Sequence, residues 1–165
     1  MTEVTETDGA RRAREALETS GIEHRITVST QRASSLAEAA EQRGIEPRDI
    51  VKSLVVRRGS GDYVFVLVPG DREISWPKLR AHLGVNRLSM PPAEKARDAT
   101  GYERGTITPF GSTSAWPVIV DATVVGRTIS MGAGAHGTSV SLAADDLVRA
   151  LAAEVADVTD PADPV

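Results

Sequence analysis

The sequence predicts an α+β fold in which a mixed, curved, barrel-like β-sheet is partly wrapped by helices. Helical and strand patterns both occur along the 165 residues, but they do not alternate regularly, which disfavours a doubly wound parallel sheet. Two neighbouring apolar runs rich in β-branched residues are joined by a short glycine-rich connection, which indicates a hairpin. The length suits one domain with one core, and no internal repeat is present.

Helices are expected from apolar spacing and from residues that favour helix ends. The first covers residues 8–20, where alanines and a leucine fall on one face, and Gly21 ends it. The second begins at a capping box, in which Ser35 and Glu38 satisfy backbone amides, and stops at Gly44. The remaining helices are expected over residues 76–83, 92–100 and 143–155.

Strands are expected where apolar, β-branched runs occur. These runs cover residues 22–28, 50–56, 63–68, 117–125, 128–131 and 139–142. The segment from Gly101 to Ser114 is rich in glycine, threonine and serine, and we expect it to be a loop. The domain should span residues 10–156, with a flexible N-terminus over 1–9 and a flexible C-terminal tail over 157–165.

The composition excludes several classes of function. Hydrophobic residues make up 41% and charged residues 25%, which is typical of a soluble globular protein. The absence of cysteine excludes disulfides, thiolate metal sites and a cysteine nucleophile. No apolar run approaches the roughly 20 residues needed to cross a bilayer, and the N-terminus lacks the apolar stretch of a secretory signal. We therefore expect a cytoplasmic protein that does not contact membranes.

The net charge of −4 disfavours an extended nucleic-acid surface, because proteins that grip a phosphate backbone usually carry an excess of basic residues. A local basic patch would overcome this if several basic side chains shared one face. The candidates are Arg57, Arg58, Arg72, Lys78, Arg80 and Arg87. Scattered, solvated charges are the alternative interpretation.

A screen for familiar catalytic motifs is largely negative. The three histidines lie far apart without paired spacing, so no metal site is expected. The glycines of residues 132–137 match a dinucleotide fingerprint, but the chain continues as a strand where that motif needs a helix. The glycine spacing around Ser112 does not fit a nucleophile elbow. We expect neither a metal nor an organic cofactor.

Lys52 is unusual, because it stands within the apolar run Ile50–Val56 of a chain with three lysines and sixteen arginines. Lysine is seldom buried without a partner, since stripping water from an ammonium group is costly. One interpretation places Lys52 near the sheet edge, where its side chain reaches solvent. The other makes it a cation in an apolar-walled pocket, positioned to meet an anion or a developing negative charge.

The segment Gly105–Pro109 is the second unusual feature. Its glycine and proline, with Gly111 shortly after, indicate a shaped loop whose backbone amides can point at a ligand. An ordinary surface turn is the alternative. Neither this loop nor Lys52 decides the function by itself.

Taken in order, these features resemble the YbaK and prolyl-tRNA synthetase associated domain family. The resemblance runs from about Gly21 to Leu151. The matching segments are residues 39–44, 50–55, 101–102, 105–111, 132–137 and 142–151. It implies the family's fold and a free-standing editing domain that hydrolyses the ester of a mischarged transfer RNA.

The resemblance also implies roles for individual residues. Lys52 matches the family's lysine, expected to bind the terminal phosphate or adenosine and to orient the ester. The loop from Gly105 matches the family's Gly-x-x-x-Pro motif, whose amides are expected to hold the aminoacyl carbonyl. Lys52 and Gly105 are therefore the expected catalytic residues. The residues expected to bind the substrate are Ser53, Thr106, Ile107, Thr108, Pro109, Phe110, Gly111, Ser130, Gly132, Gly134 and His136.

Two departures from the family pattern bear on the amino-acid specificity. Many relatives have a histidine just after the first strand, where this chain has Val28-Ser29-Thr30. Several have an acidic residue near the position of Thr138 and Ser139, which is absent here. No side chain stands out as a general base, so water or a substrate group is expected to attack the ester.

The sequence therefore predicts a trans-editing aminoacyl-tRNA deacylase, with cysteine, alanine or a similar small residue on tRNA(Pro) as its substrate. Such editing is physically sensible because a synthetase pocket gains only about 1–3 kcal/mol per methylene. We expect a monomer whose partner is the acceptor end of the transfer RNA, and a synthetase that delivers this RNA is a candidate second partner. A non-catalytic module that binds an RNA end, a nucleotide or a protein is the alternative, and hydrolysis of another small acyl ester is a third reading.

Overall fold

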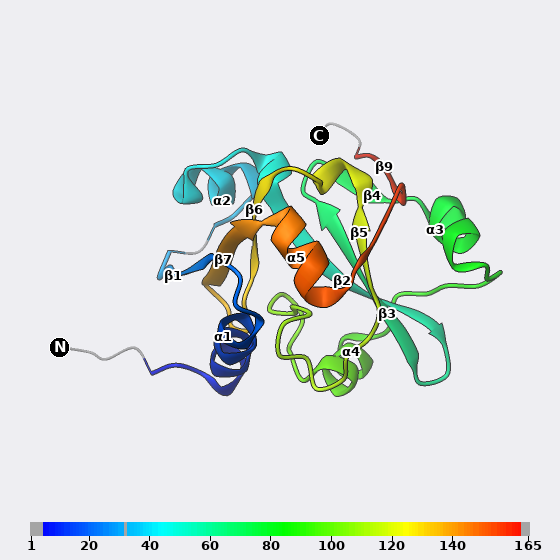
Figure 1. Ribbon diagram of the computed structural model, residues 1–165, viewed down its shortest axis with the longest axis horizontal. Helices are drawn as coiled ribbons and strands as arrows, with labels where there is room; N and C mark the ends of the chain where they lie inside the picture. Colours follow the sequence, from blue (N-terminus) through cyan, green and yellow to red (C-terminus); the bar gives the residue numbers. More distant parts are fainter. Residues whose placement is uncertain (1–4, 32, 163–165) are drawn as a thin grey trace.

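The computed structural model describes residues 5–31 and 33–162 (Figure 1). The helices are α1 (Asp8–Ser20), α2 (Leu36–Arg43), α3 (Trp76–Leu83), α4 (Ala93–Thr100) and α5 (Ala144–Leu151), with short 3₁₀ turns η1 (Pro47–Asp49) and η2 (Ala122–Val124). The strands are β1 (His24–Val28), β2 (Ile50–Gly59), β3 (Asp62–Pro69), β4 (Arg72–Ile74), β5 (Val118–Asp121), β6 (Thr128–Gly132), β7 (Thr138–Ala143), β8 (Glu154–Ala156) and β9 (Thr159–Pro161).

A mixed sheet forms the centre of the fold, as the sequence predicts. Within the described residues it has seven strands in the order β1-β7-β6-β2-β3-β5-β8, and β4 and β9 form a separate pair. The hairpin β2–β3 and the pairs β1–β7 and β6–β7 are antiparallel, whereas β2–β6, β3–β5 and β5–β8 are parallel. The irregular order of helices and strands along the chain thus produces an α+β architecture.

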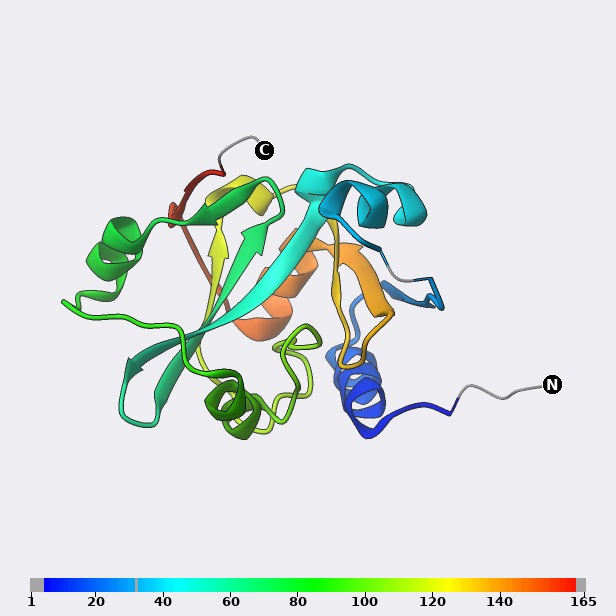
Figure 2. The same ribbon diagram turned by 180° about the vertical axis from the view of Figure 1, so that it is seen from behind.

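Alternating side chains of the hairpin enter two separate apolar cores. Val55 and Phe65 face the larger core, which α1, α4 and α5 cover. Val56 and Val64 face the smaller core, which is closed by Leu79 of α3. Figure 2 shows α2 on the near side of the sheet and α3 beside its edge, and Figure 1 shows α1 and α5 in front from the opposite side. The site described below lies on the α2 side.

Helix ends are set locally and agree with the predicted positions. Ser35 accepts a hydrogen bond from the Glu38 amide at the start of α2, and Gly44 ends that helix in a left-handed conformation with φ of 68°. Ser75 caps α3 in the same way, through the Lys78 amide. The helices predicted over 8–20 and 76–83 have these bounds in the structure.

The predicted last helix, over 143–155, is wrong at its C-terminal end. It stops at Leu151, because Ala152 adopts a left-handed conformation with φ of 50° and its amide caps the helix. Val155 does not continue the apolar helix face but pairs with Val120, in the parallel contact between β8 and β5. Tertiary strand pairing therefore outweighs the helical spacing of the apolar residues. The strand expected over 117–125 likewise ends at Asp121, where η2 begins.

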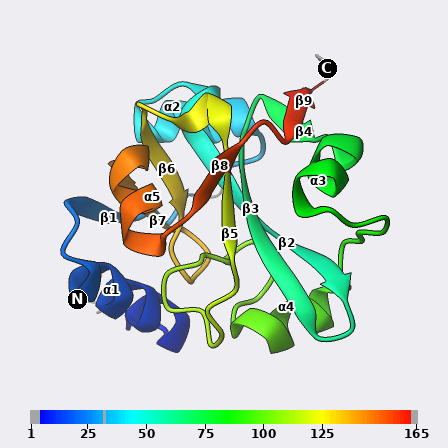
Figure 3. The ribbon, with the colours of Figure 1, turned by 45° about the vertical axis from the view of Figure 1, so that its right-hand side comes forward.

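The flexible tail predicted from residue 157 is also wrong for the part that the structure describes. Val158 and Thr159 are fully buried, and β9 pairs antiparallel with β4, a strand that the sequence did not indicate. Figure 3 shows this pair above α3, with β8 leading into it. The Asp121 carboxylate accepts a hydrogen bond from the Val158 amide at 3.2 Å, which ties this segment to β5. Residues 163–165 of the expected tail and 1–4 of the expected flexible N-terminus lie outside the described residues.

Candidate functional site

Lys52 lies in the interior of the sheet, where β2 separates from β6. It pairs with Val68 of β3, and its side chain is exposed. The parallel pairing of β2 with β6 is confined to Ile50–Ser130 and Val51–Met131. Since side chains alternate along a strand, Lys52 lies on the same face as Ser130. No ion pair among the described residues includes Lys52, so its ammonium group is a solvated cation on this face.

The loop Gly105–Pro109 lies in the gap between these two strands. Figures 1 and 2 both show its tip between β2 and the turn that joins β6 to β7. Gly105 has φ of 89°, a left-handed conformation that glycine adopts without strain. The Thr106 carbonyl accepts a hydrogen bond from the Gly134 amide at 3.0 Å, which fixes the tip to the turn.

Hydrogen bonds inside the loop decide which of its groups face outward. The Thr106 amide and hydroxyl both donate to the Glu103 carbonyl, at 2.9 and 2.7 Å. The Thr108 hydroxyl accepts a hydrogen bond from the Phe110 amide at 3.3 Å. The side chains of Thr106, Thr108 and Phe110 are all buried. Within the described residues, no hydrogen bond uses the amide of Gly105 or of Ile107. A ligand would therefore meet these two amides rather than that of Thr106.

His136 connects the loop to the glycine-rich turn. A Cβ added to Gly105 would lie 3.4 Å from His136 Cε1, so the imidazole packs directly on the loop backbone. His136 Nε2 lies 3.9 Å from a carboxylate oxygen of Glu103, and both side chains are largely exposed. A Cβ added to Gly132 would lie 3.8 Å from the Ile107 carbonyl oxygen, so the turn and the loop form one continuous surface.

A cavity of about 710 Å³ adjoins this surface, between α2 and the face of β1, β7 and β6. It includes His136 in its lining, but neither Lys52 nor the loop. Six hydroxyl-bearing residues line it: Thr27, Ser29, Thr30, Ser130, Ser139 and Ser141. Arg25 and Arg43 line it as well, and no carboxylate does among the residues that the structure describes. This lining favours a polar or anionic ligand over a cation.

Arg43 connects α2 to the sheet across this cavity. From the last turn of α2, its guanidinium donates to the Ser130 hydroxyl at 2.9 Å. Partial burial lowers the pKa of Arg43, an effect of desolvation, yet an arginine remains cationic at neutral pH. Sequence reasoning missed this residue and Arg25. The sequence does carry one sign of the cavity that they line. Ser139 and Ser141 are two residues apart, which places both hydroxyls on one face of β7.

Ser53 and Gly111 are not brought to the face that carries Lys52. Ser53 pairs with Leu67 and points to the opposite face of the sheet, where its buried hydroxyl has no hydrogen-bond partner among the described residues. Gly111 lies at the far end of the loop, within contact distance of the backbone of α1. The loop tip therefore adjoins Gly132, Gly134 and His136, and Ser130 pairs with Ile50, two residues before Lys52 on β2. Ser53 and Gly111 lie apart from this group.

Four of the six basic residues considered as a patch do share a surface. Arg57, Arg58, Arg80 and Arg87 line a second hollow of about 450 Å³ between the β2–β3 hairpin and the segment after α3, and no acidic residue lines it. Asp62 pairs with Arg58 at 2.9 Å. In this chain of net charge −4, the hollow is a local concentration of positive charge.

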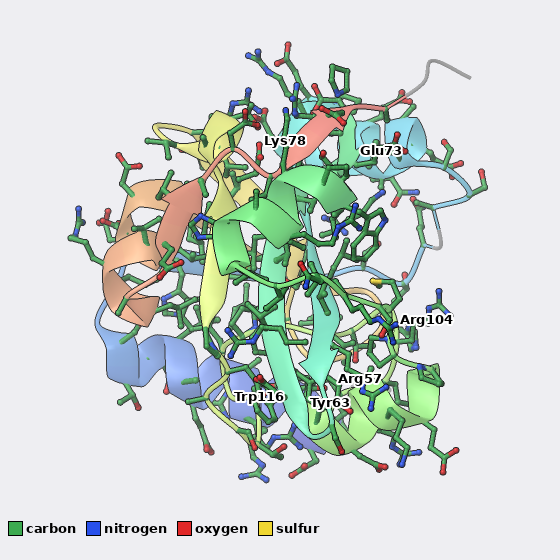
Figure 4. All side chains as sticks on the ribbon, turned by 90° about the vertical axis from the view of Figure 1, so that its right-hand side faces the viewer. Arg57, Tyr63, Glu73, Lys78, Arg104 and Trp116 are labelled. Carbon is green, nitrogen blue, oxygen red and sulfur yellow. The ribbon has the colours of Figure 1, made fainter. Side chains whose placement is uncertain are left out.

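Arg72 and Lys78 belong to a different region. Arg72 donates to Thr159, and Lys78 contacts two aspartates of the C-terminal segment, Asp157 and Asp160. Figure 4 shows Lys78 in the upper part of the molecule and Arg57 in the lower part. The side chains of Arg72 and Lys78 therefore hold the segment 157–160 in place.

Neither a metal-binding cluster nor a membrane-spanning helix is present among the described residues. No group of three or more histidine, aspartate or glutamate side chains is placed to hold a metal ion in the part of the chain that the structure describes. Of the helices described, none combines the length and the apolar character that a membrane crossing requires.

The chain is similar to known proteins in both sequence and fold. A family model described as "Aminoacyl-tRNA editing domain" matches residues 30–150. A proline–tRNA ligase of Thermosipho melanesiensis is 39% identical over 87 residues, which are 53% of this chain and 15% of the ligase. The chain thus spans a small part of the length of such ligases.

Smaller proteins match this chain over a greater share of both lengths than the ligase does. The Enterococcus faecalis protein named "Putative Cys-tRNA(Pro)/Cys-tRNA(Cys) deacylase EbsC" is 27% identical over 126 residues, covering 76% of this chain and 77% of that protein. The crystal structure of "a putative trans-editing enzyme for prolyl tRNA synthetase" has a TM-score of 0.86 and 26% identity, covering 94% of this chain and 99% of the other.

Proposed function

Because the chain belongs to the aminoacyl-tRNA editing domain family, we propose that it is a deacylase that hydrolyses the ester of a mischarged transfer RNA in trans. The observation that supports this most directly is the gap between β2 and β6. Lys52 lies on one side of it, and the tip of the Gly105 loop and His136 lie on the other. A cation and unpaired backbone amides are the two groups that a phosphate-linked ester needs.

In the proposed reaction, Lys52 binds the phosphate or ribose of the terminal nucleotide and orients the ester. The amides of Gly105 and Ile107 donate to the carbonyl oxygen, which becomes negative as a water molecule or a substrate hydroxyl or thiol attacks. Donors fixed before the reaction cost no reorganisation at that moment, and one such donor contributes about 10²–10³ in rate. When water attacks, directly or with a substrate hydroxyl accepting its proton, the C–O bond breaks, the ribose oxygen takes up a proton, and the free amino acid leaves the transfer RNA. When the thiol of a mischarged cysteine attacks, the same C–O bond breaks and the product is a cyclic thioester, which water then opens to the free amino acid.

The cavity under α2 is proposed to receive the remainder of the terminal aminoacyl-nucleotide. Its volume of about 710 Å³ exceeds what a small amino acid alone would fill. Arg25 and Arg43 suit a phosphate, and the hydroxyl groups suit a ribose or a small polar side chain. The substrate class that we propose is a small amino acid, cysteine or alanine, on tRNA(Pro), in keeping with the names of the similar proteins.

The basic hollow favours transfer RNA over a small free ester as the substrate. Arg57 stands five residues beyond Lys52 on β2, a distance of roughly 16 Å at the rise of a strand. A transfer RNA whose end occupies the gap would place acceptor-stem phosphates near Arg80 and Arg87.

A non-catalytic RNA-end binding module is the second candidate. The positively charged, hydroxyl-lined cavity would serve such a module equally well, and no carboxylate lines it to act as a base. Binding without hydrolysis of any mischarged transfer RNA would favour this alternative.

The test is a deacylation assay with tRNA(Pro) carrying alanine, cysteine or proline. We expect the protein to release the wrong amino acid but not proline, and Lys52→Ala to lower the rate by about 10²–10³. Lys95→Ala is the matched control, because Lys95 is an exposed lysine of α4. Buffer-level decay of all three substrates would contradict this substrate class, and equal loss of activity in both variants would contradict the role of Lys52.

A further inference from the structure

Helix α1 lies outside the segment that matches the family model, which begins at residue 30, yet it contacts the candidate catalytic loop directly. Its face toward the larger core is anchored by Ala13 and Leu17, both fully buried. Arg12, the residue before Ala13, reaches the ends of the loop that carries Gly105, and only about a quarter of its side chain is exposed. Helix α1 is therefore a rigid support from which one side chain reaches the loop.

Arg12 bridges the two ends of that loop. Its Nη2 donates to the Gly101 carbonyl at 3.0 Å, and its Nε donates to the Gly111 carbonyl at 3.3 Å. Its Nη1 is bound by Asp8 at 2.8 Å, which compensates the charge. A planar guanidinium can make these three contacts at once, whereas a lysine ammonium cannot reproduce their geometry.

Tyr102 makes the second part of the same contact. Its ring lies under the Arg12 guanidinium, with 4.6 Å from Cζ to the ring centroid. Its hydroxyl donates to the Phe110 carbonyl at 2.6 Å, and the side chain is 1% exposed. The residues flanking Gly105–Pro109 on both sides are thus held together by one stacked pair of side chains.

Close packing against α1 leaves no room for a side chain at either of these glycines. Gly101 and Gly111 both have left-handed φ angles, 77° and 76°. A Cβ on Gly111 would lie 2.6 Å from the Arg12 carbonyl oxygen, and one on Gly101 would lie 2.7 Å from Arg12 Nη2. The loop ends therefore contact α1 with their backbones as well as through hydrogen bonds.

The start of α1 reaches the loop tip by a second route. A Cβ on Gly9 would lie 2.2 Å from the Gly134 carbonyl oxygen, so the two backbones are in direct contact. The Gly134 amide donates to the Thr106 carbonyl. Helix α1 consequently touches both the ends of the loop and the turn that fixes its tip.

From these contacts we propose that Arg12, stacked on Tyr102, is a positioning residue that holds the Gly105 loop in its reactive geometry. It acts through the loop backbone and does not touch the substrate. The proposal rests on the proposed function for its effect on the rate, but the rigidity of the loop can be measured without any substrate. A misplacement of reacting groups by about 1 Å costs about 10²-fold in rate, which sets the scale of the effect.

The experiment compares Arg12→Ala and Arg12→Lys with Arg14→Ala. Arg14 lies on the same helix but pairs with Glu6 and Glu18 and makes none of the loop contacts, so it controls for the loss of a cation and of an ion pair. We expect Arg12→Ala to lower kcat for deacylation by about 10²-fold and to leave KM within about twofold, because only the geometry of the reacting groups changes. Arg12→Lys should recover little of this loss, and Arg14→Ala should match the wild type.

Hydrogen exchange of the loop amides provides the readout that does not depend on catalysis. Amides of residues 103–110 should exchange at least about tenfold faster in Arg12→Ala than in Arg14→Ala, with no change in the strands. If Arg12→Ala does not fold, Arg12→Lys carries the comparison, since it keeps the charge and loses the geometry of the contacts to Gly101 and Gly111. Unchanged exchange in these residues would overturn the proposal, as would a kcat equal to that of the control. A wild type that exchanges as expected but does not deacylate would contradict the proposed function and leave the contact supported.

Discussion

The salt dependence of transfer-RNA binding tests the basic hollow quantitatively. Among its four arginines, Arg58 is paired with Asp62 and Arg57 donates to the Gly59 carbonyl, whereas Arg80 and Arg87 make no ion pair among the described residues. The double variant Arg80→Ala, Arg87→Ala therefore removes the two cations that are free to meet phosphates.

The magnitude follows from counterion release. Each phosphate contact contributes about 0.7–0.9 to the slope of log K against log salt, so the double variant should reduce the slope by about 1.4–1.8. Relative to a 1 M reference, this corresponds to about 15–30-fold weaker binding at roughly 0.15 M salt. The effect should fall on KM for the intact transfer RNA and leave kcat unchanged, because the hollow lies about 16 Å from Lys52.

The assay is fluorescence anisotropy with labelled tRNA(Pro) over a series of salt concentrations. The control is Arg11→Ala, Arg149→Ala, which changes the net charge equally but on α1 and α5, at the opposite face of the sheet. If both double variants reduced the slope alike, the net charge rather than the hollow would be responsible. An unchanged slope in the Arg80, Arg87 variant would refute the assignment of this surface.

Two further predictions concern stability. Asp121→Ala should lower the free energy of unfolding by about 2–5 kcal/mol in urea titrations, because the fully buried carboxylate accepts from the amides of Thr123 and Val158 and both would lose their partner; a loss below about 1 kcal/mol would show that water replaces the carboxylate. Burial raises the pKa of Tyr102, so its contribution to stability is complete below about pH 10 and is lost as the pH rises through the higher folded value. Urea titrations at a series of alkaline pH values should therefore show a steeper loss in the wild type than in Tyr102→Phe, and parallel losses would contradict this.

The features that the sequence predicted well are those set by local interactions. Helix caps are one example: Ser35, Ser75 and Gly44 act within one turn of their own helices. Their pattern can therefore be recognised without knowledge of the fold. The hairpin β2–β3 is equally local, since a short glycine-containing turn joins two β-branched runs.

The features that were missed depend on distant partners. Val155 continues the apolar spacing of α5, and nothing in its neighbourhood reveals that it pairs with Val120. The contact of Thr159 with Arg72 joins residues 87 positions apart. Because this partner is so distant in the sequence, β9 was predicted to be part of a flexible tail. Burial of the C-terminal segment is a property of the assembled sheet rather than of its own composition.

The same distinction holds for the candidate site. Lys52 and the Gly105 loop were identified because each is unusual in its own segment, and the resemblance to a family gave them roles. Arg12 was not, because its partner Gly111 is 99 residues away and the helix around it looks like any surface helix. Arg43, which reaches Ser130 at a separation of 87 residues, is a similar case.

The short ladder between β2 and β6 has a mechanical consequence. Strands β1, β7 and β6 form one plate and β2, β3, β5 and β8 another, and within the described residues the plates share two residue pairs. A sheet bends most easily where its hydrogen bonds are fewest, so deformation of this molecule concentrates along that line. Lys52 stands on one plate and the turn carrying His136 on the other. Any change in the angle between the plates therefore alters the distance between these two groups, while distances within each plate stay fixed.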